Sequence, residues 1–305
     1  MSLLVIGTVA FDAIETPFGK TDKIVGGAAT YAGLAATYFY DQVKIVAVVG
    51  DDFPQEDIKD FEKHGIDTEG LQIKKGEKSF FWSGKYHNDM NSRDTLITEL
   101  NVLADFDPII PESYQDCEYL MLGNLTPQVQ QTVIKRLTKR PKLIVMDTMN
   151  FWMDIAMDDL KETIKLVDVL TINDAEARQL SGEYSLVKAA RKILTMGPKY
   201  LIIKKGEHGA LLFNEDRIFS APALPLADVF DPTGAGYTFA GGFIGYLAKV
   251  GTIIFNNMKN ALIYGSALAS FCVEKFGTEK IKNLSDEEIA SRIQEFVSLS
   301  AFEIA

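Results

Sequence analysis

The densest run of residues that could do chemistry lies at 231–236, where the sequence reads DPTGAG and continues at once into a segment with helical spacing. Small residues let the backbone turn tightly and point successive N–H groups outward, and a helix start adds unpaired amides and a positive dipole end. Such a segment can bind an anion. A loop that only closes a corner between a strand and a helix has the same composition, so the motif alone leaves both interpretations open.

Two other segments resemble phosphate-binding motifs without completing them. Residues 18–21 read FGKT, like the end of a P-loop, but Ile14 stands where that motif needs its first glycine. Gly7 follows an apolar run without the further glycines of a dinucleotide fingerprint. The sequence therefore excludes a P-loop and disfavours a dinucleotide-dependent oxidoreductase.

The overall charge narrows the choice of partner. The chain has 305 residues with 31 Lys and Arg against 42 Asp and Glu, a net charge of −11, and no Lys/Arg-rich run. Affinity for nucleic acid comes largely from neutralising phosphates, so we expect no nucleic-acid partner. A small phosphorylated ligand is still compatible, because amides and one or two local cations can outweigh net charge in a cleft.

The cysteines and the N-terminal segment predict a protein without disulfides and without a membrane span. Cys117 and Cys272 form no CxxC or Cys/His cluster, so we expect two buried thiols and no zinc site. Residues 1–10 are apolar but too short to cross a membrane and lack the features of a signal peptide. We expect this segment to be a buried strand in a cytoplasmic protein.

The elements that must position the 231–236 loop are short apolar runs separated by helical spacing. Runs that are apolar throughout indicate strands buried on both faces, as in a doubly wound α/β fold with a mostly parallel sheet. Six such runs occur, at 3–9, 43–49, 119–122, 143–146, 167–172 and 200–203. Helices are predicted at 238–250, 254–275 and 285–298, the last beginning with a capping box of Ser285 and Glu288.

The segment 71–100 differs from the rest. Its polar, aromatic and β-branched residues alternate, which predicts an antiparallel ribbon outside the main sheet. Either a lid over a site or a hairpin that covers a sheet edge would account for it. Because exposed strand edges invite pairing, we also expect the ribbon to form a homodimer with a second copy of the chain.

Taken together, five motifs in a fixed order resemble the ribokinase-like (PfkB) family of carbohydrate and nucleoside kinases. The resemblance runs over essentially the whole chain and rests on Asp12, the Gly26-Gly27-Ala28 run, and the segments 173–176, 204–209 and 231–236. It implies one domain over 1–305, a doubly wound sheet with helices on both faces, and a small β-sheet lid built from about 71–100 plus about 12–22. It also implies transfer of the γ-phosphoryl of ATP, with Mg²⁺, to a hydroxyl of a sugar or nucleoside.

The resemblance implies a substrate site at one end of a cleft. Asp12 would accept hydrogen bonds from substrate hydroxyls, as an ionised carboxylate can, and Gly26 and Gly27 would let the substrate approach the backbone. Asp12 could otherwise be a simple turn residue. Selectivity would come from the lid, including Asn101 as a substrate-binding residue and Arg93, which could bind a substrate phosphate or be only a solvated arginine.

On the nucleotide side, Asn173 and Glu176 would order the Mg²⁺-bound phosphates through water, since magnesium keeps much of its hydration shell. Their spacing is also that of a helix capping arrangement, and both interpretations can hold. Lys204 could in turn be an ordinary residue at a strand end. The resemblance places the remaining residues as follows: Lys204, Gly206 and Gly209 beside the nucleotide, Gly234, Ala235 and Gly236 in an anion hole, and Asp231 and Thr233 at a monovalent cation such as K⁺, with Thr233 also near the nucleotide.

Tyr237 departs from the family pattern. The residue after GAG is an aspartate in the family, where it removes the proton from the attacking hydroxyl, and here it is a tyrosine. A carboxylate is ionised at neutral pH, whereas a phenol titrates near pH 10. The chain is then an active-kinase scaffold with a disabling substitution, a non-catalytic protein that binds sugar or nucleotide, or a kinase with another base, for which the sequence offers no candidate. We favour the first.

Overall fold

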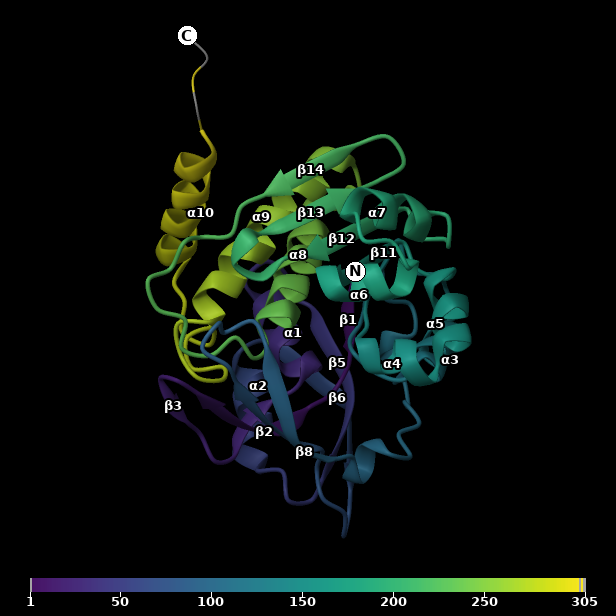
Figure 1. Cartoon of the computed structure of the whole chain (residues 1–305). Helices are drawn as coiled ribbons and strands as arrows, with labels where there is room; N and C mark the ends of the chain where they lie inside the picture. The colour runs from purple at the N-terminus through teal and green to yellow at the C-terminus, as the bar shows by residue number, and fades with distance from the viewer. Residues whose placement is uncertain (1, 302, 304–305) are drawn as a thin grey trace.

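A computed structural model describes residues 2–301 and 303 of the chain. Its centre is a nine-stranded sheet in the order β14-β13-β12-β11-β10-β9-β1-β5-β6, in which all strands run parallel except β13, which pairs antiparallel with both of its neighbours (Figure 1). The doubly wound α/β prediction is confirmed. The strands are β1 Leu3–Ile6, β5 Val43–Gly50, β6 Ile66–Lys74, β9 Tyr119–Leu122, β10 Leu143–Asp147, β11 Val169–Asn173, β12 Tyr200–Lys204, β13 Ala210–Phe213 and β14 Ile218–Ala221.

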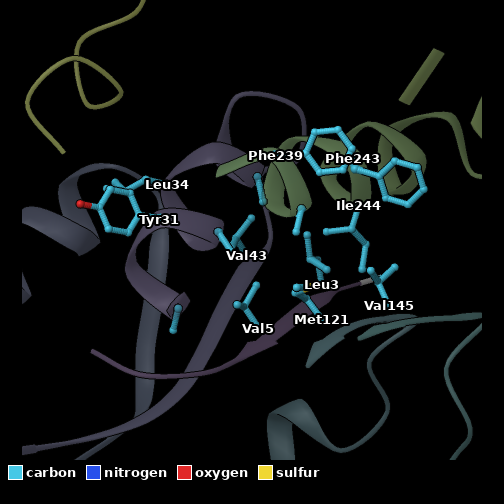
Figure 2. Close-up of a cluster of buried hydrophobic side chains, with 14 of the residues drawn as sticks. Leu3, Val5, Tyr31, Leu34, Val43, Met121, Val145, Phe239, Phe243 and Ile244 are labelled. Atoms are coloured by element: carbon cyan, nitrogen blue, oxygen red, sulfur yellow. The ribbon is translucent and has the colours of Figure 1, made fainter. Parts of the chain in front are cut away.

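Helices cover both faces of this sheet because the inner strands are apolar on both sides. In β1, Leu3 and Val5 belong to one buried cluster, shown in Figure 2, and Leu4 and Ile6 to the other. The first cluster packs against α1 Ala28–Thr37, α2 Gln55–Lys63, α8 Ala235–Val250 and α9 Phe255–Cys272. The second packs against α3 Pro127–Arg136, α4 Asn150–Ile155, α5 Met157–Ile164, α6 Asp174–Ser181 and α7 Leu186–Leu194.

A second, smaller sheet stands beside the main one, in the lower part of Figure 1. It contains β2 Ala10–Thr16, β3 Gly19–Lys20, β4 Ile24–Gly26, β7 Phe81–Tyr86 and β8 Arg93–Glu99. The predicted ribbon began too early, because residues 71–74 pair with β5 and belong to the main sheet. Only β7 and β8 form an antiparallel hairpin, and β7 also pairs in parallel with β2.

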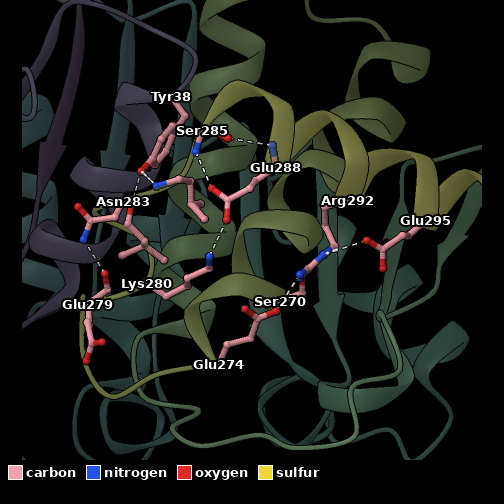
Figure 3. A network of polar contacts seen from close by, with 12 residues as sticks. Tyr38, Ser270, Glu274, Glu279, Lys280, Asn283, Ser285, Glu288, Arg292 and Glu295 are labelled. Atoms are coloured by element: carbon pink, nitrogen blue, oxygen red, sulfur yellow. Dashed lines mark hydrogen bonds and ion pairs between the residues drawn. The ribbon is translucent and has the colours of Figure 1, made fainter.

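The C-terminal helix α10, Asp286–Ser300, is fixed to the body by charged side chains (Figure 3). Its predicted capping box is present, with Ser285 and Glu288 each bonding the backbone N–H of the other. Arg292 donates to Glu274 and to Ser270, both at 2.7 Å. Elsewhere, both cysteines are buried free thiols, as expected. Among the described residues, the helices are too short or too polar to span a bilayer.

Candidate functional site

Polar residues gather at the carboxyl edge of the parallel sheet. Asp147 ends β10, Asn173 ends β11 and Lys204 ends β12, with Asn173 directly opposite Lys204 in the strand pairing. The carboxyl ends of parallel strands meet at one edge, where open α/β sheets bind ligands. The fold therefore brings together side chains that are far apart in the sequence.

A buried ion pair occupies the floor of this edge. The Lys204 ammonium lies 2.7 Å from the Asp147 carboxylate, whose side chain is 5% exposed against 21% for Lys204. Burial raises the pKa of Asp147, and Lys204 offsets part of that rise. The ammonium also lies 3.3 Å from the position of a Cβ at Gly236. Lys204 is thus held by Asp147 against the predicted anion-binding loop.

Asn173 and Glu176 form the predicted capping box at the start of α6. The Asn173 N–H donates to Glu176 Oε2 at 2.7 Å, and the Glu176 N–H donates to Asn173 Oδ1 at 2.8 Å. Glu176 is only 8% exposed, and burial raises its pKa to about 7 despite the opposing effect of Lys204. The helix cap therefore also places a carboxyl group near the Asp147–Lys204 pair.

The 231–236 loop is built around the buried Asp231. Its carboxylate accepts the N–H groups of Thr233 at 2.8 Å and Gly277 at 2.9 Å, which partly offset the rise in pKa caused by burial. Gly234 has a φ of +80°, and a Cβ there would lie 2.3 Å from the Tyr31 ring, so only glycine fits.

Helix α8 begins directly after this turn, at Ala235. The Ala235 N–H bonds the Pro232 carbonyl, whereas the N–H groups of Gly236 and Tyr237 donate to no other residue that the structure describes. The first turn of a helix with unpaired amides attracts anions. The loop therefore has the geometry expected of an anion hole.

Asp12 lies on β2 rather than in a turn after the first strand. A Cβ at Gly26 would come within 1.9 Å of Asp12 Oδ2, so the carboxylate packs directly against the Gly26 backbone. Burial, followed by the nearby Asp231, raises the pKa of Asp12 to about 7, and the Gly27 N–H offsets part of the rise. The turn interpretation is thereby wrong.

Tyr31 packs its ring against Gly234 of the loop. Burial raises the pKa of its hydroxyl. Asp12 is linked to the loop through β4, because it pairs with Ile24, whose side chain lies 2.8 Å from the position of a Cβ at Gly277, and the Gly277 N–H donates to Asp231. Asp12 and the 231–236 loop therefore belong to one site.

A cavity of about 420 Å³ opens beside the loop. Three of the predicted nucleotide residues, Lys204, Gly206 and Gly209, contribute to its polar side together with Gly236 of the predicted anion hole. Much of the remaining lining is apolar and includes Leu224, Pro225, Leu226, Val229 and Val273. A volume of this size, lined by both polar and apolar residues, suits a nucleotide-sized ligand.

Tyr237 is the third residue of α8 and is partly buried near the Asp147–Lys204 ion pair. Burial raises the pKa of its phenol, and the Asp147 carboxylate raises it further, while Asn124 and Arg93 act in the opposite direction. The phenol is therefore neutral at physiological pH and can donate a proton to a hydrogen bond but cannot act as a carboxylate base.

Asn101 lies near the strand that carries Asp12, because its partner Ser79 precedes Phe80, whose carbonyl accepts the Phe11 N–H at 2.9 Å. It sits at the foot of the small sheet with a φ of +48°, and its Nδ2 donates to the Ser79 carbonyl at 2.9 Å. This contact fixes the chain where it leaves β8. Arg93 begins β8, and its guanidinium lies 5.7 Å from the Trp82 ring centre and 5.9 Å from that of Tyr86.

Three residues of the site were missed in the sequence: Asp147, Tyr31 and Tyr86. Asp147 had a usable signal, since it directly follows the apolar run 143–146 and so had to lie at the ligand-binding edge of a parallel sheet. Tyr31 and Tyr86 had none, because the contact of Tyr31 depends on how α1 packs against the start of α8 and that of Tyr86 on how the small sheet packs. Tyr86 is buried and its hydroxyl accepts the Thr233 hydroxyl at 3.1 Å.

Solved structures first place the fold among the ribokinase-like proteins. A putative ribokinase II from E. coli matches with a TM-score of 0.81 at 21% identity, covering 96% of this chain and 99% of that one. The nucleoside kinase of Methanocaldococcus jannaschii matches with a TM-score of 0.76 at 19% identity, covering 97% and 99%. At these identities the likeness establishes the fold.

Sequence comparison then establishes the family. The model of the pfkB family carbohydrate kinases matches residues 2–284. A cytidine kinase from Thermococcus kodakarensis is 31% identical over 250 residues, which cover 80% of this chain and 87% of the relative. The chain belongs to the pfkB family of carbohydrate kinases.

Proposed function

We propose that this chain is an ATP-dependent phosphotransferase scaffold that acts on a hydroxyl of a sugar or nucleoside. The observation that carries the proposal is that Asp12 and the 231–236 loop belong to one site, joined through Ile24 and Gly277, with a cavity of about 420 Å³ beside the loop. Asp12 accepts substrate hydroxyls, and the loop receives the terminal phosphate. The small sheet acts as the lid.

The nucleotide binds in the cavity in this proposal. The amides of Gly236 and Tyr237 and the Lys204 ammonium contact its phosphates and stabilise the charge that develops there during transfer. The apolar wall around Val229 and Val273 receives the base. One solved relative, the putative ribokinase II from E. coli, is described as a complex with ATP and Mg²⁺.

A magnesium ion fits this site through phosphate and water rather than through a protein cage. No group of three or more metal-ligating side chains occurs in residues 2–301 and 303. Glu176, beside Lys204, is the carboxyl group that would hold ion-bound water. When bound, the ion neutralises phosphate charge.

Asp231 and Thr233 are proposed as part of a monovalent cation site. Both Asp231 oxygens already accept backbone N–H groups, so carbonyl oxygens would form most of the coordination and Asp231 would supply charge. This charge lies behind the anion hole rather than in the path of the phosphates.

Substrate recognition rests on Asp12 and the small sheet. The relatives of this chain include a cytidine kinase, a ribokinase and a nucleoside kinase, whose names all refer to hydroxyl-rich compounds. Trp82 and Arg93 on the small sheet supply an aromatic surface and a cation for such a ligand. We propose a sugar or nucleoside without choosing between the two.

Tyr237 makes transfer slow in this proposal. The neutral phenol cannot take the proton of the attacking hydroxyl, while the remaining parts of the site are present. Phosphoryl transfer depends mainly on positioning and charge stabilisation, so slow turnover persists. The second candidate is a ligand-binding protein without turnover, which the raised pKa of Tyr237 favours.

The test compares this chain with Tyr237→Asp across sugars and nucleosides, with MgATP. Thermal shift reports binding, and ADP release reports turnover. We expect ligand stabilisation of both chains and turnover that is about 10²-fold or more faster in Tyr237→Asp, since a general base contributes about 10² to 10⁴. Stabilisation of both without turnover in either would support the binding protein instead.

We further propose that the small sheet pairs with a second copy of the chain. Every residue of β8 is exposed, and Leu96, Ile97 and Leu100 present apolar side chains at 55%, 47% and 49% exposure. Exposed apolar strands favour association. Light scattering should give twice the mass of one chain, and a monomer would contradict this proposal.

A further inference from the structure

The turn between β7 and β8, residues 87–92, reaches beyond the substrate side of the cleft. Asp89, Met90 and Asn91 from this turn line the same cavity as Lys204 and Gly236. The small sheet, expected to cover a sugar, thereby also forms a wall of the cavity proposed for the nucleotide.

Asn91 connects the turn to the segment that holds Gly206. A Cβ placed at Gly206 would lie 2.5 Å from Asn91 Oδ1, so the carboxamide packs directly against the Gly206 backbone. Gly206 is two residues from Lys204, on the polar side of the cavity. The carboxamide has two N–H donors, which suit phosphate oxygens.

A second contact seats the hairpin on the anion-binding loop. Tyr86, the last residue of β7, is buried and accepts the Thr233 hydroxyl at 3.1 Å. Thr233 belongs to the 231–236 loop. The hairpin therefore touches both polar segments of the cavity, at Thr233 and at Gly206.

The turn holds Asn91 in a defined place. The Asp89 carboxylate accepts the N–H groups of Asn91 at 3.1 Å and Ser92 at 2.9 Å. At the base of the turn, His87 contacts Asp94 of β8 at 2.9 Å. A group held in this way loses little conformational entropy when a ligand binds.

We propose that Asn91 is a nucleotide-binding residue supplied by the lid, and that its carboxamide donates to the phosphates of a bound nucleoside diphosphate or triphosphate. The inference rests on the proposed function, because it assumes that the cavity holds a nucleotide. Asn91 is assigned to the phosphates of the nucleotide rather than to its base, because Gly206 and Lys204 lie on the polar side of the cavity.

Coupling between the two ligands follows. A lid that contacts the nucleotide at Asn91 and the substrate at its inner face closes more readily over either one when the other is bound. Linkage requires the effect to be reciprocal. Nucleotide binding should therefore tighten substrate binding by the same factor by which substrate tightens nucleotide binding.

Calorimetric titration of the full chain with MgADP and with adenosine tests the assignment. Asn91→Ala should weaken MgADP about 5-fold, which corresponds to the loss of one hydrogen bond of about 1 kcal/mol. Asn91→Asp should weaken it about tenfold or more, because a second anion faces the phosphates. Adenosine, which has no phosphate, should bind all variants alike.

Asn88→Ala is the matched control, since Asn88 is an exposed residue of the same turn that does not line the cavity. It should bind MgADP like the parent chain. If the parent binds MgADP and the Asn91 variants bind it equally well, the assignment of Asn91 is wrong while the proposed function stands. If the parent binds no MgADP or MgATP, both are wrong.

Discussion

The two ends of the cleft hold buried carboxylates in opposite electrostatic settings. At the substrate end, Asp12 faces another acid, Asp231, and no lysine or arginine pairs with either among the described residues. At the nucleotide end, Asp147 is held 2.7 Å from the Lys204 ammonium. Both carboxylates are buried, yet only one has a counter-charge within the protein.

This difference matches the ligands proposed for the two ends. A buried anion without a partner is costly, and hydroxyl donors from a neutral substrate relieve that cost at Asp12. Phosphates bring their own negative charge, so the nucleotide end needs a cation in place beforehand. Lys204 is that cation, and Asp147 fixes its position beside Gly236.

The largest expected loss of stability comes from removing the cation. Lys204→Met leaves the Asp147 carboxylate buried and unpaired, which should lower the free energy of unfolding by about 3 kcal/mol in urea titrations at pH 7. Nucleotide binding should fall as well. Lys205→Met is the control, since Lys205 forms no ion pair with any described residue. Equal stability of the two variants would break the contrast between the two ends.

Removing the charge of Asp12 should raise the free energy of unfolding rather than lower it. Its folded pKa of about 7 lies above the ordinary value of 3.8, so the folded state binds the extra proton and stability falls as pH rises from about 4 through 7. Asp12→Asn stays neutral at every pH. Its free energy of unfolding relative to the parent should rise over this range and reach a gain of about 4 kcal/mol at pH 8.

Denaturant titrations at pH 5 and pH 8 would check this prediction, with ligand binding measured in parallel. The same substitution should weaken substrate binding, because an amide replaces two carboxylate acceptors with one. A difference between Asp12→Asn and the parent that does not change with pH would show that Asp12 is ionised in the folded protein throughout.

A smaller effect on stability should come from the contact between Gly234 and the Tyr31 ring. Gly234→Ala must place a Cβ 2.3 Å from the Tyr31 ring and also adopt a φ of +80°. Gly251→Ala adopts a similar φ of +71° but meets nothing within 4 Å. Gly234→Ala should therefore be less stable than Gly251→Ala by about 1 to 2 kcal/mol in thermal unfolding. Equal losses would mean that Tyr31 moves aside freely.

Much of this arrangement could be predicted from the sequence. The apolar runs identified the parallel strands because a strand that is buried on both faces must be apolar at nearly every position. The capping boxes at Asn173 and Ser285 were readable because they are local, with both partners within three residues. The DPTGAG loop was recognisable for the same reason.

The parts that were missed depend on contacts between distant segments. The pairing of residues 71–74 with β5 is set by the main sheet and not by their own pattern. The Asn101 amide donates to the carbonyl of Ser79, 22 residues away in the sequence, while its predicted contact with the substrate stays a prediction. The ion pair of Asp147 with Lys204 spans 57 residues, and neither residue alone indicates the other.

The most direct test of the whole account is a crystal structure of this chain with Mg²⁺ and a non-hydrolysable ATP analogue. The account predicts that the terminal phosphate lies within hydrogen-bonding distance of the Gly236 amide and the Lys204 ammonium, with its open side toward Asp12. A nucleotide bound elsewhere on the chain, or one whose terminal phosphate points away from Asp12, would contradict it.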